Sequence, residues 1–169
     1  RMLCQKHGMD MAEMERWYDG YRIGDESHMF NPYSVMRAIE ENCFRSYWTT
    51  TGAYDSVKTY IQMNFEGLKD DIIRMLAGER VYVNTSKFTN DMNNVRSKHD
   101  VLTVLIHLGY LAYDDDTKRC YVPNKEVSDE LLNAVEDTSW SRLIDAITAS
   151  QDLLNDTIAC NEQAVARAI

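Results

Sequence analysis

The segment RWYDGYRIGDESHMFNP, residues 16–32, restricts the possible folds more than any other part of the sequence. Gly20 stands where a left-handed residue would end a helix over residues 9–19, whose apolar side chains recur at helical spacing. The tripeptides YRI and HMF then flank the polar turn GDES, which predicts a short β-hairpin. Asn31 and Pro32 supply a helix N-cap and a first-turn proline. The chain must therefore end one helix, form a hairpin and begin another helix within this segment.

Further amphipathic stripes predict a largely helical chain. After Pro32, apolar side chains recur on one helical face that we expect to be buried; they are Val35, Met36, Ile39 and Cys43. Similar stripes predict further helices near residues 53–65, 67–78 with a stop at Gly78, and 98–108. Asn124 can cap another helix, with Val127, Leu131, Leu132 and Val135 as its buried stripe, and two more helices close the chain.

A different texture begins at residue 79. The run RVYVN is typical of a short strand, and a helix over 98–108 ends at Gly109. Two alternating runs, 110–113 and 119–122, predict a hairpin with an acidic turn. A helix followed by a hairpin is the pattern of a winged helix. We therefore expect a mostly α fold with small β-hairpins.

These patterns predict an organisation in three parts. Residues 1–78 would form a helical, lid-like subdomain with the WYDGY hairpin, and residues 79–136 a winged-helix-like unit. Residues 137–169 would form C-terminal helices that lead towards a further domain. The helical pattern NEQAVARAI runs to the last residue without a capping glycine, as expected of a piece of a longer polypeptide.

Composition narrows the functional classes. Apolar residues make up 44% of the 169 residues, and no apolar run is long enough to cross a bilayer, so we expect a folded, soluble, cytoplasmic protein without a membrane partner. The formal net charge of −9 repels phosphate backbones, which argues against direct nucleic-acid binding. The four cysteines are far apart and include no CxxC pair, so we expect reduced thiols.

Catalytic and metal-binding motifs are absent from the sequence. It contains no GxxxxGK[ST] loop to hold a triphosphate, no HExxH pair for zinc and no GxSxG nucleophile. The acidic run Asp114–Asp116 lacks the spacing of a calcium loop, and we interpret it as a solvated turn. We expect no cofactor, no metal and no enzymatic activity in this chain alone.

Residues 16–32 allow two interpretations. Asp19, Arg22 and the nearby rings have the chemistry to hold a flat base or a phosphate by stacking and a guanidinium fork. Equally, every residue has a structural role in a joint where one helix stops and the next begins. The second interpretation accounts for more of the residues.

Five motifs in register, WYDGYRIG, FNPYSVMRAI, YWTTTG, VLTVLIHLGYLAYD and YVPNKEV, resemble the AAA-ATPase-like proteins of bacteria. The likeness covers nearly the whole chain. Ile23 and Tyr33 stand where members often have Phe and Trp, which are conservative differences. In that family a P-loop ATPase core precedes the WYDGY segment, and a restriction-endonuclease-like nuclease domain commonly follows the region where this chain ends.

The resemblance implies that this chain is the lid and winged-helix region between those two domains, which would be its partners within one polypeptide. ATP with magnesium would be the cofactor of the parent protein. The resemblance also implies residues close to the nucleotide, with Arg22 sensing phosphate and the Asn31–Pro32 step near the adenine. The full set of candidates is Tyr18, Asp19, Tyr21, Arg22, Asn31 and Pro32.

Two functional hypotheses follow. In the first, the chain is a non-catalytic regulatory segment that completes a nucleotide site and couples it to a downstream effector. In the second, the winged helix binds nucleic acid or another protein, with the helix over 98–108 as the recognition element. Only Arg96 and Lys98 supply cations near that helix, and the wing tip is Asp114–Asp116, so the sequence favours the first hypothesis.

Overall fold

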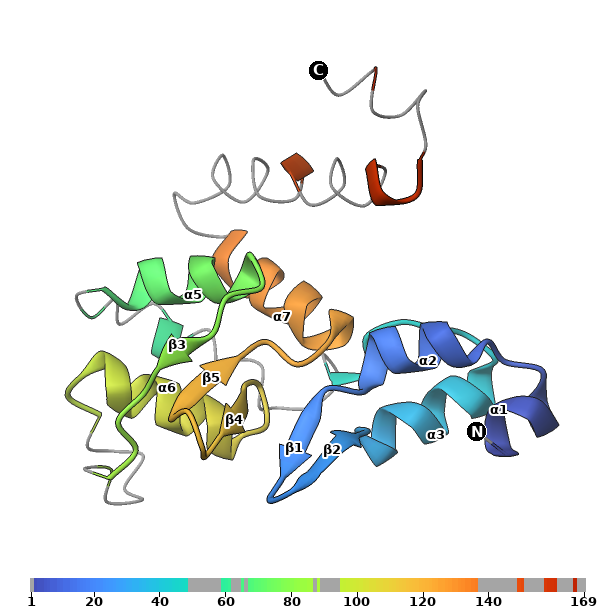
Figure 1. Cartoon of the computed structure of the whole chain (residues 1–169), viewed down its shortest axis with the longest axis horizontal. Coiled ribbons are helices and arrows are strands. Elements are labelled where there is room, and N and C mark those ends of the chain that lie inside the picture. Colours follow the sequence, from blue (N-terminus) through green and yellow to red (C-terminus); the bar gives the residue numbers. More distant parts are fainter. Residues whose placement is uncertain are drawn as a thin grey trace. The chain divides into compact units, whose positions relative to one another are not determined.

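The structure is a computed structural model that describes residues 2–48, 59–61, 65, 67–86, 88, 95–136, 149–150, 157–160 and 166. Contacts divide the chain into two compact units, residues 1–134 and 135–169. The elements from α1 to α7 in Figure 1 belong to the first unit, apart from the last residues of α7. Among the described residues, none of the helices has the length and apolar character needed to span a bilayer. The predicted closing helices and most of the predicted helix over 53–65 lie outside the described residues.

Short helices form the N-terminal part, α1 (Met2–His7), α2 (Met11–Tyr18) and α3 (Pro32–Glu41). α2 ends shortly before Gly20, which adopts the predicted positive φ, at +107°. α3 begins as the sequence predicts, because Asn31 Oδ1 accepts hydrogen bonds from the backbone N–H groups of Tyr33 and Ser34 at 3.1 and 3.4 Å. α2 and α3 pack side by side in Figure 1.

The hairpin between α2 and α3 is tighter than predicted. Its strands are β1 (Tyr21–Ile23) and β2 (Glu26–Met29), so the turn is Gly24–Asp25 and not the four residues GDES. Gly24 has a φ of +60°, which suits the first central residue of a two-residue hairpin turn. The register shifts by one residue along the hairpin, and His28, at φ +64°, takes up the extra residue as a bulge.

The buried face of α3 also differs from the prediction. Ser34 and Ala38 are the fully buried residues, whereas Met36 and Cys43 of the predicted stripe are exposed. Ser34 is buried because its hydroxyl binds a carboxylate on another helix. A polar side chain with a buried partner cannot be recognised from hydrophobic spacing.

The second half of the unit surrounds a three-stranded antiparallel sheet in the order β3-β5-β4. Predicted elements in this half are confirmed with small shifts of their ends. They are α5 (Leu68–Leu76), β3 (Val81–Tyr82), α6 (Lys98–His107), β4 (Ala112–Asp114), β5 (Arg119–Tyr121) and α7 (Lys125–Glu136). β4 begins two residues later than expected, because the N–H groups of Tyr110 and Leu111 turn back to the Leu105 carbonyl.

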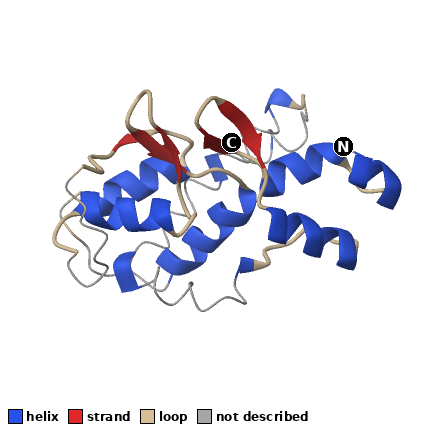
Figure 2. Ribbon diagram, turned by 90° about the horizontal axis from the view of Figure 1, so that it is seen from below, coloured by secondary structure: helices blue, strands red, loops and turns tan. Residues whose placement is uncertain are grey.

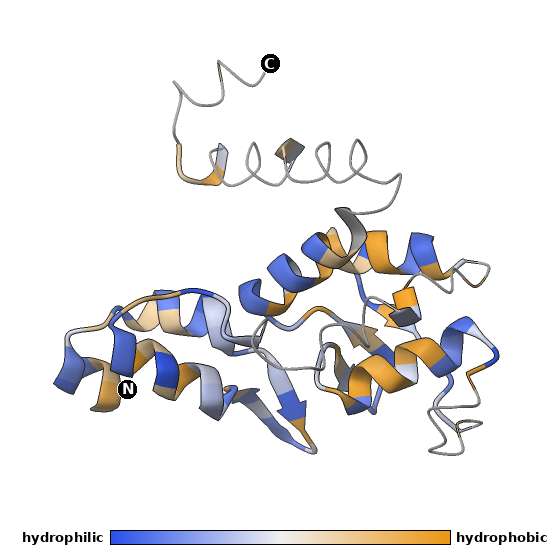
Figure 3. Ribbon diagram, turned by 180° about the vertical axis from the view of Figure 1, so that it is seen from behind, coloured by the Kyte–Doolittle hydropathy of each residue, from blue (hydrophilic) through white to orange (hydrophobic). Residues whose placement is uncertain are grey.

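Apolar packing forms two clusters of buried side chains in this unit. The helices α1 to α3 enclose Cys4, Met14, Tyr18, Ala38 and Tyr47. Around the sheet, five consecutive residues of α6, from Val101 to Leu105, are buried, so this helix is covered on all sides. Figure 3 shows α6 mostly in hydrophobic colours, whereas α2 and α3 have one hydrophilic face each. The described part thus confirms a mostly helical fold with small antiparallel sheets.

Candidate functional site

The β1–β2 hairpin lies beside β4 and β5, as Figure 2 shows, and its base is bound to them. We call the contact between residues 19–22 and residues 109–126 the joint. Three of its hydrogen bonds run from a side chain to a main-chain carbonyl, which fixes the backbone of both segments. They are Tyr21 Oη to Gly109 (2.8 Å), Tyr121 Oη to Gly20 (3.1 Å) and Asn124 Nδ2 to Asp19 (2.9 Å).

Gly20 is where the two backbones approach most closely. A β-carbon on Gly20 would lie only 2.0 Å from the carbonyl oxygen of Pro123. No side chain fits in that space, and the φ of +107° also disfavours every residue except glycine. Gly20 therefore ends α2 and also permits the joint to close.

Ion pairs extend the joint to the tip of the hairpin. The Arg22 guanidinium lies 3.3 Å from an oxygen of Asp114 and 2.7 Å from an oxygen of Asp116, and its Nε donates to the Gly24 carbonyl. Arg80 holds the second oxygen of Asp114 at 3.0 Å. Arg22 thus fastens the hairpin to the turn between β4 and β5.

The interpretation of Asp114 as part of a solvated turn is wrong. This residue is only 4% exposed. Burial alone would raise the pKa of Asp114. The hydrogen bonds from Thr117 and from the Asp116 N–H, together with the nearby Arg22, outweigh burial and lower the pKa below its usual value. Asp114 is a charged anchor for two arginines, while Asp115 and Asp116 are exposed as predicted.

Beneath the joint, a buried glutamate on α7 connects three segments of the chain. One oxygen of Glu126 accepts hydrogen bonds from the Ser34 hydroxyl at 2.9 Å and from the Tyr47 N–H at 2.8 Å. One turn later, Glu130 accepts a hydrogen bond from the Ser46 hydroxyl. The second carboxylate oxygen of each glutamate is buried without a hydrogen-bond partner among the described residues.

The environment favours the neutral form of both glutamates. Burial raises the pKa of Glu126, and the proximity of Glu130 adds to this effect, although the hydrogen bonds from Tyr47 and Ser34 oppose it. Burial likewise raises the pKa of Glu130, against the hydrogen bond from Ser46. A proton on an orphaned oxygen removes the cost of a buried charge.

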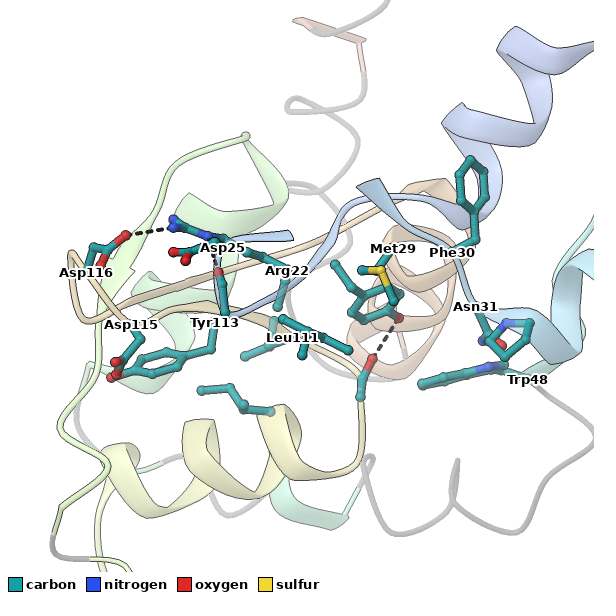
Figure 4. Close-up of a pocket in the computed structure, with 17 residues that line it drawn as sticks. Arg22, Asp25, Met29, Phe30, Asn31, Trp48, Leu111, Tyr113, Asp115 and Asp116 are labelled. Atoms are coloured by element: carbon teal, nitrogen blue, oxygen red, sulfur yellow. Dashed lines mark hydrogen bonds and ion pairs between the residues drawn. The ribbon is translucent and has the colours of Figure 1, made fainter. Parts of the chain in front are cut away.

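A groove of about 880 Å³ opens between the hairpin and the β4 side of the sheet (Figure 4). Acidic side chains line one end of the groove, and aromatic and apolar side chains line the other end. The acidic residues are Asp25, Asp115 and Asp116, and the aromatic and apolar ones include Met29, Trp48 and Leu111. The groove falls within the size range of ligand sites, 300–1,000 Å³ on the general scale of such pockets.

The structure brings four of the six candidate residues to this groove, Tyr21, Arg22, Asn31 and Pro32. Tyr18 is fully buried between α2 and α3, with its hydroxyl bonded to the backbone of Arg45. Asp19 is also buried, and one carboxylate oxygen lies 2.8 Å from Nδ1 of the exposed His28. Neither of these residues lines the groove.

Metal binding requires several ligating side chains close together, and thiolate chemistry requires a cysteine whose thiol ionises readily. The described residues contain no group of three or more His, Cys, Asp or Glu residues placed to hold a metal ion. All four cysteines are free, as predicted, and burial raises the pKa of the Cys120 thiol to about 12, which leaves it protonated near neutral pH.

Sequence reasoning missed Trp48, Leu111 and Glu126. Trp48 packs edge-on against Tyr110, with ring centroids 4.6 Å apart, and its ring touches Gly109. Glu126 lies in the first turn of α7, where an acidic residue is ordinary. Their position within the five motifs is the one feature of the sequence that could have pointed to them.

No family model, no curated protein and no solved structure matches this chain.

Proposed function

We propose that this chain is a non-catalytic regulatory segment of an ATP-binding protein of the AAA-ATPase-like kind, in which the joint couples a lid to a winged-helix-like unit. One observation carries the proposal. The motifs that resemble that family are far apart in sequence, yet they meet in the joint. WYDGYRIG supplies Gly20 and Tyr21, VLTVLIHLGYLAYD supplies Gly109, and YVPNKEV supplies Tyr121 and Asn124.

The other two motifs reach the same place through Glu126. FNPYSVMRAI contributes the Ser34 hydroxyl and YWTTTG the Tyr47 N–H, and both bind the same carboxylate oxygen. Trp17 also packs against Lys125, whose Nζ lies 4.8 Å from the ring centroid. Shared motifs that form one contact are expected of an element whose function depends on that contact.

Strand order supports a winged-helix-like unit. The first strand, β3, pairs with the last, β5, and β4 forms the outer edge after α6. This is the arrangement of a helical core with an appended wing. In the proposed protein, the β4–β5 turn is the wing, and Arg22 fastens the lid hairpin to it.

Arg22 is the residue that we propose to exchange partners. Its guanidinium bonds are made to Asp114, Asp116 and Gly24, so a phosphate held by an upstream ATPase core would have to draw it away from the wing. The Arg22 side chain is half-buried, but its partner Asp116 is 74% exposed, and an ion pair with so exposed a carboxylate stabilises a protein only weakly, so this pair can be exchanged at low cost. Loss of this contact would free the hairpin tip and change the position of the wing.

Nucleic-acid binding through α6 is the second candidate, and two observations weigh against it. Residues Val101–Leu105 are buried in succession, so α6 offers no continuous face to a groove of DNA. Lys98, at its start, is paired with Asp71 at 2.7 Å. Measured binding to duplex DNA that falls steeply with added salt would nevertheless place this function first.

The experiment is ATP binding and hydrolysis by the longer polypeptide that includes the sequence before residue 1. Arg22→Ala should weaken ATP binding or slow hydrolysis several-fold. Arg37→Ala is the matched control, because Arg37 also pairs with acidic side chains, Glu40 and Glu41, but lies outside the joint. The proposal is wrong if the longer protein binds no ATP, or if the two variants behave alike.

A further inference from the structure

The groove lies between the β1–β2 hairpin and β4 of the sheet. β4 is an edge strand of its sheet, and β1 is a strand of the separate hairpin that lies next to it. Residues of both strands line the groove. Grooves beside edge strands commonly receive peptides in extended conformation, because alternate side chains then point into the groove.

The two ends of the groove differ in chemistry, as Figure 4 shows. Met29 and Trp48 supply the apolar and aromatic surface at one end, where the buried Leu111 also belongs to the lining, and Met29 is 38% exposed although it has no polar group to hydrate. Asp25, Asp115 and Asp116 mark the other end. A single ligand that satisfies both ends must combine an apolar group with a cation.

The charges of the lining residues determine which charge the ligand should have. Arg22 is the one cation among the lining residues, and it is already bound to Asp114 and Asp116. Asp115 is paired with Lys118, whereas Asp25 has no ion-pair partner within the described part of the chain. The lining thus has three carboxylates against one guanidinium, on a protein of net charge −9. While Arg22 stays bound to Asp114 and Asp116, an anionic ligand is repelled from the groove and a cationic one is attracted.

We propose that this groove binds a basic peptide segment in extended conformation. An apolar side chain of the peptide contacts Met29 and Trp48, and a lysine or arginine reaches Asp25 at the other end. The site is present in the chain by itself and does not depend on the ATP-linked function. It provides a docking surface for a partner protein with an exposed basic and apolar stretch.

The test is titration of the whole chain, labelled with nitrogen-15, with the peptide acetyl-VKVKFK-amide. The matched probe is acetyl-VEVEFE-amide, which keeps the apolar side chains and reverses the charge. We expect binding of the basic peptide with a Kd on the order of 10–100 μM, as for small interfaces, and weaker binding as salt is added. Amide shifts should centre on Gly24, Met29 and Tyr113.

Two pairs of variants locate the site. Met29→Ser should weaken peptide binding about tenfold, because the contact of an apolar side chain is lost. Met36→Ser is its control, since Met36 is 50% exposed and lies outside the groove. Asp25→Asn should weaken binding about threefold, as expected for an exposed charge pair. Asp70→Asn, an exposed carboxylate on α5, should leave binding unchanged.

Several results would overturn the proposal. They are no binding at millimolar peptide, equal or tighter binding of the acidic peptide, shifts that centre elsewhere, and equal effects of Met29→Ser and Met36→Ser. Occupation by a second copy of the chain is also tested, by sedimentation. If the chain forms a dimer that Met29→Ser dissociates, and the basic peptide does not bind, the groove is a self-association surface and the proposal is wrong.

Discussion

Gly20→Ala tests the joint most directly. The new methyl group would lie 2.0 Å from the Pro123 carbonyl oxygen, well inside contact distance, and neither partner has a rotamer through which to move away. The backbone must therefore shift by more than an ångström. Alanine at a φ of +107° costs about 1–3 kcal/mol in strain. A shift that breaks the hydrogen bonds at Gly20 and Asp19 costs about 1 kcal/mol for each bond.

Together these terms predict a loss of about 4 kcal/mol in the free energy of unfolding, a large share of the 5–15 kcal/mol that is usual for a domain. Gly24→Ala is the control, because Gly24 also has a positive φ, +60°, but a β-carbon there meets no atom within 4 Å. Strain alone applies at that position, and we expect a loss of about 1–2 kcal/mol.

Urea unfolding followed by tryptophan fluorescence measures both losses. Trp17 and Trp48 lie in the first unit and Trp140 in the second, so a Trp140→Phe background makes the signal report the unit that contains the joint. With a slope of about 2 kcal/mol per M, Gly20→Ala should lower the midpoint by about 2 M, and Gly24→Ala by less than 1 M. Equal midpoints for the two variants would refute the argument that close approach at Gly20 closes the joint.

Other predictions concern single interactions of the joint. Tyr21→Phe removes the hydrogen bond to the Gly109 carbonyl and should cost about 1 kcal/mol, whereas Tyr33→Phe, at an exposed ring, should be neutral by the same urea assay. Glu126→Ala leaves the Ser34 hydroxyl and the Tyr47 N–H without an acceptor and should cost about 2–4 kcal/mol; a loss below 1 kcal/mol would contradict the structure. Burial raises the folded-state pKa of Glu130 above its ordinary value of 4.5. The protonated carboxyl therefore stabilises the folded state fully below about pH 4.5, and this stabilisation is lost as pH rises through the folded-state pKa. Glu130→Gln should therefore become more stable relative to the wild type from about pH 4 towards neutrality, in urea unfolding at each pH, and an unchanged difference would show that the carboxyl is not shifted.

Local signals predicted much of this fold. Asn31 and Pro32 start α3, and Gly109 follows α6, because caps and stop residues act on their own backbone. The sequence also predicts the buried residues of α6, because the spacing of apolar residues along a helix is visible without knowing which segments pack against it. In the hairpin, the sequence predicted the strands but not the two-residue turn, because the bulge at His28 changes the register by one residue.

The errors arise where a partner lies far along the chain. Ser34 is polar and was not expected in the buried face of α3, but Glu126, on another helix, accepts its hydrogen bond. Asp114 was expected in solvent, but Arg22 and Arg80 bury and neutralise it. The candidate site was half predicted for the same reason. The sequence predicts the WYDGY segment as the place where one helix stops and the next begins, but not its contact with residues 109–126, and the groove residues Trp48 and Leu111 likewise depend on contacts that no local pattern contains.

The ion pairs at the tip of the hairpin are weaker than the buried hydrogen bonds of Glu126 beneath the joint, and in the proposed function this difference would determine how movement is transmitted. At the tip, Arg22 pairs with Asp116, whose side chain is 74% exposed, and such pairs weaken with salt. At the base, Glu126 is fully buried and binds α3 and the segment after it at once. A buried polar contact of this kind is costly to break. In the proposed function, a displacement of the hairpin would therefore separate the tip first, while movement of α3 would be passed through Glu126 to α7.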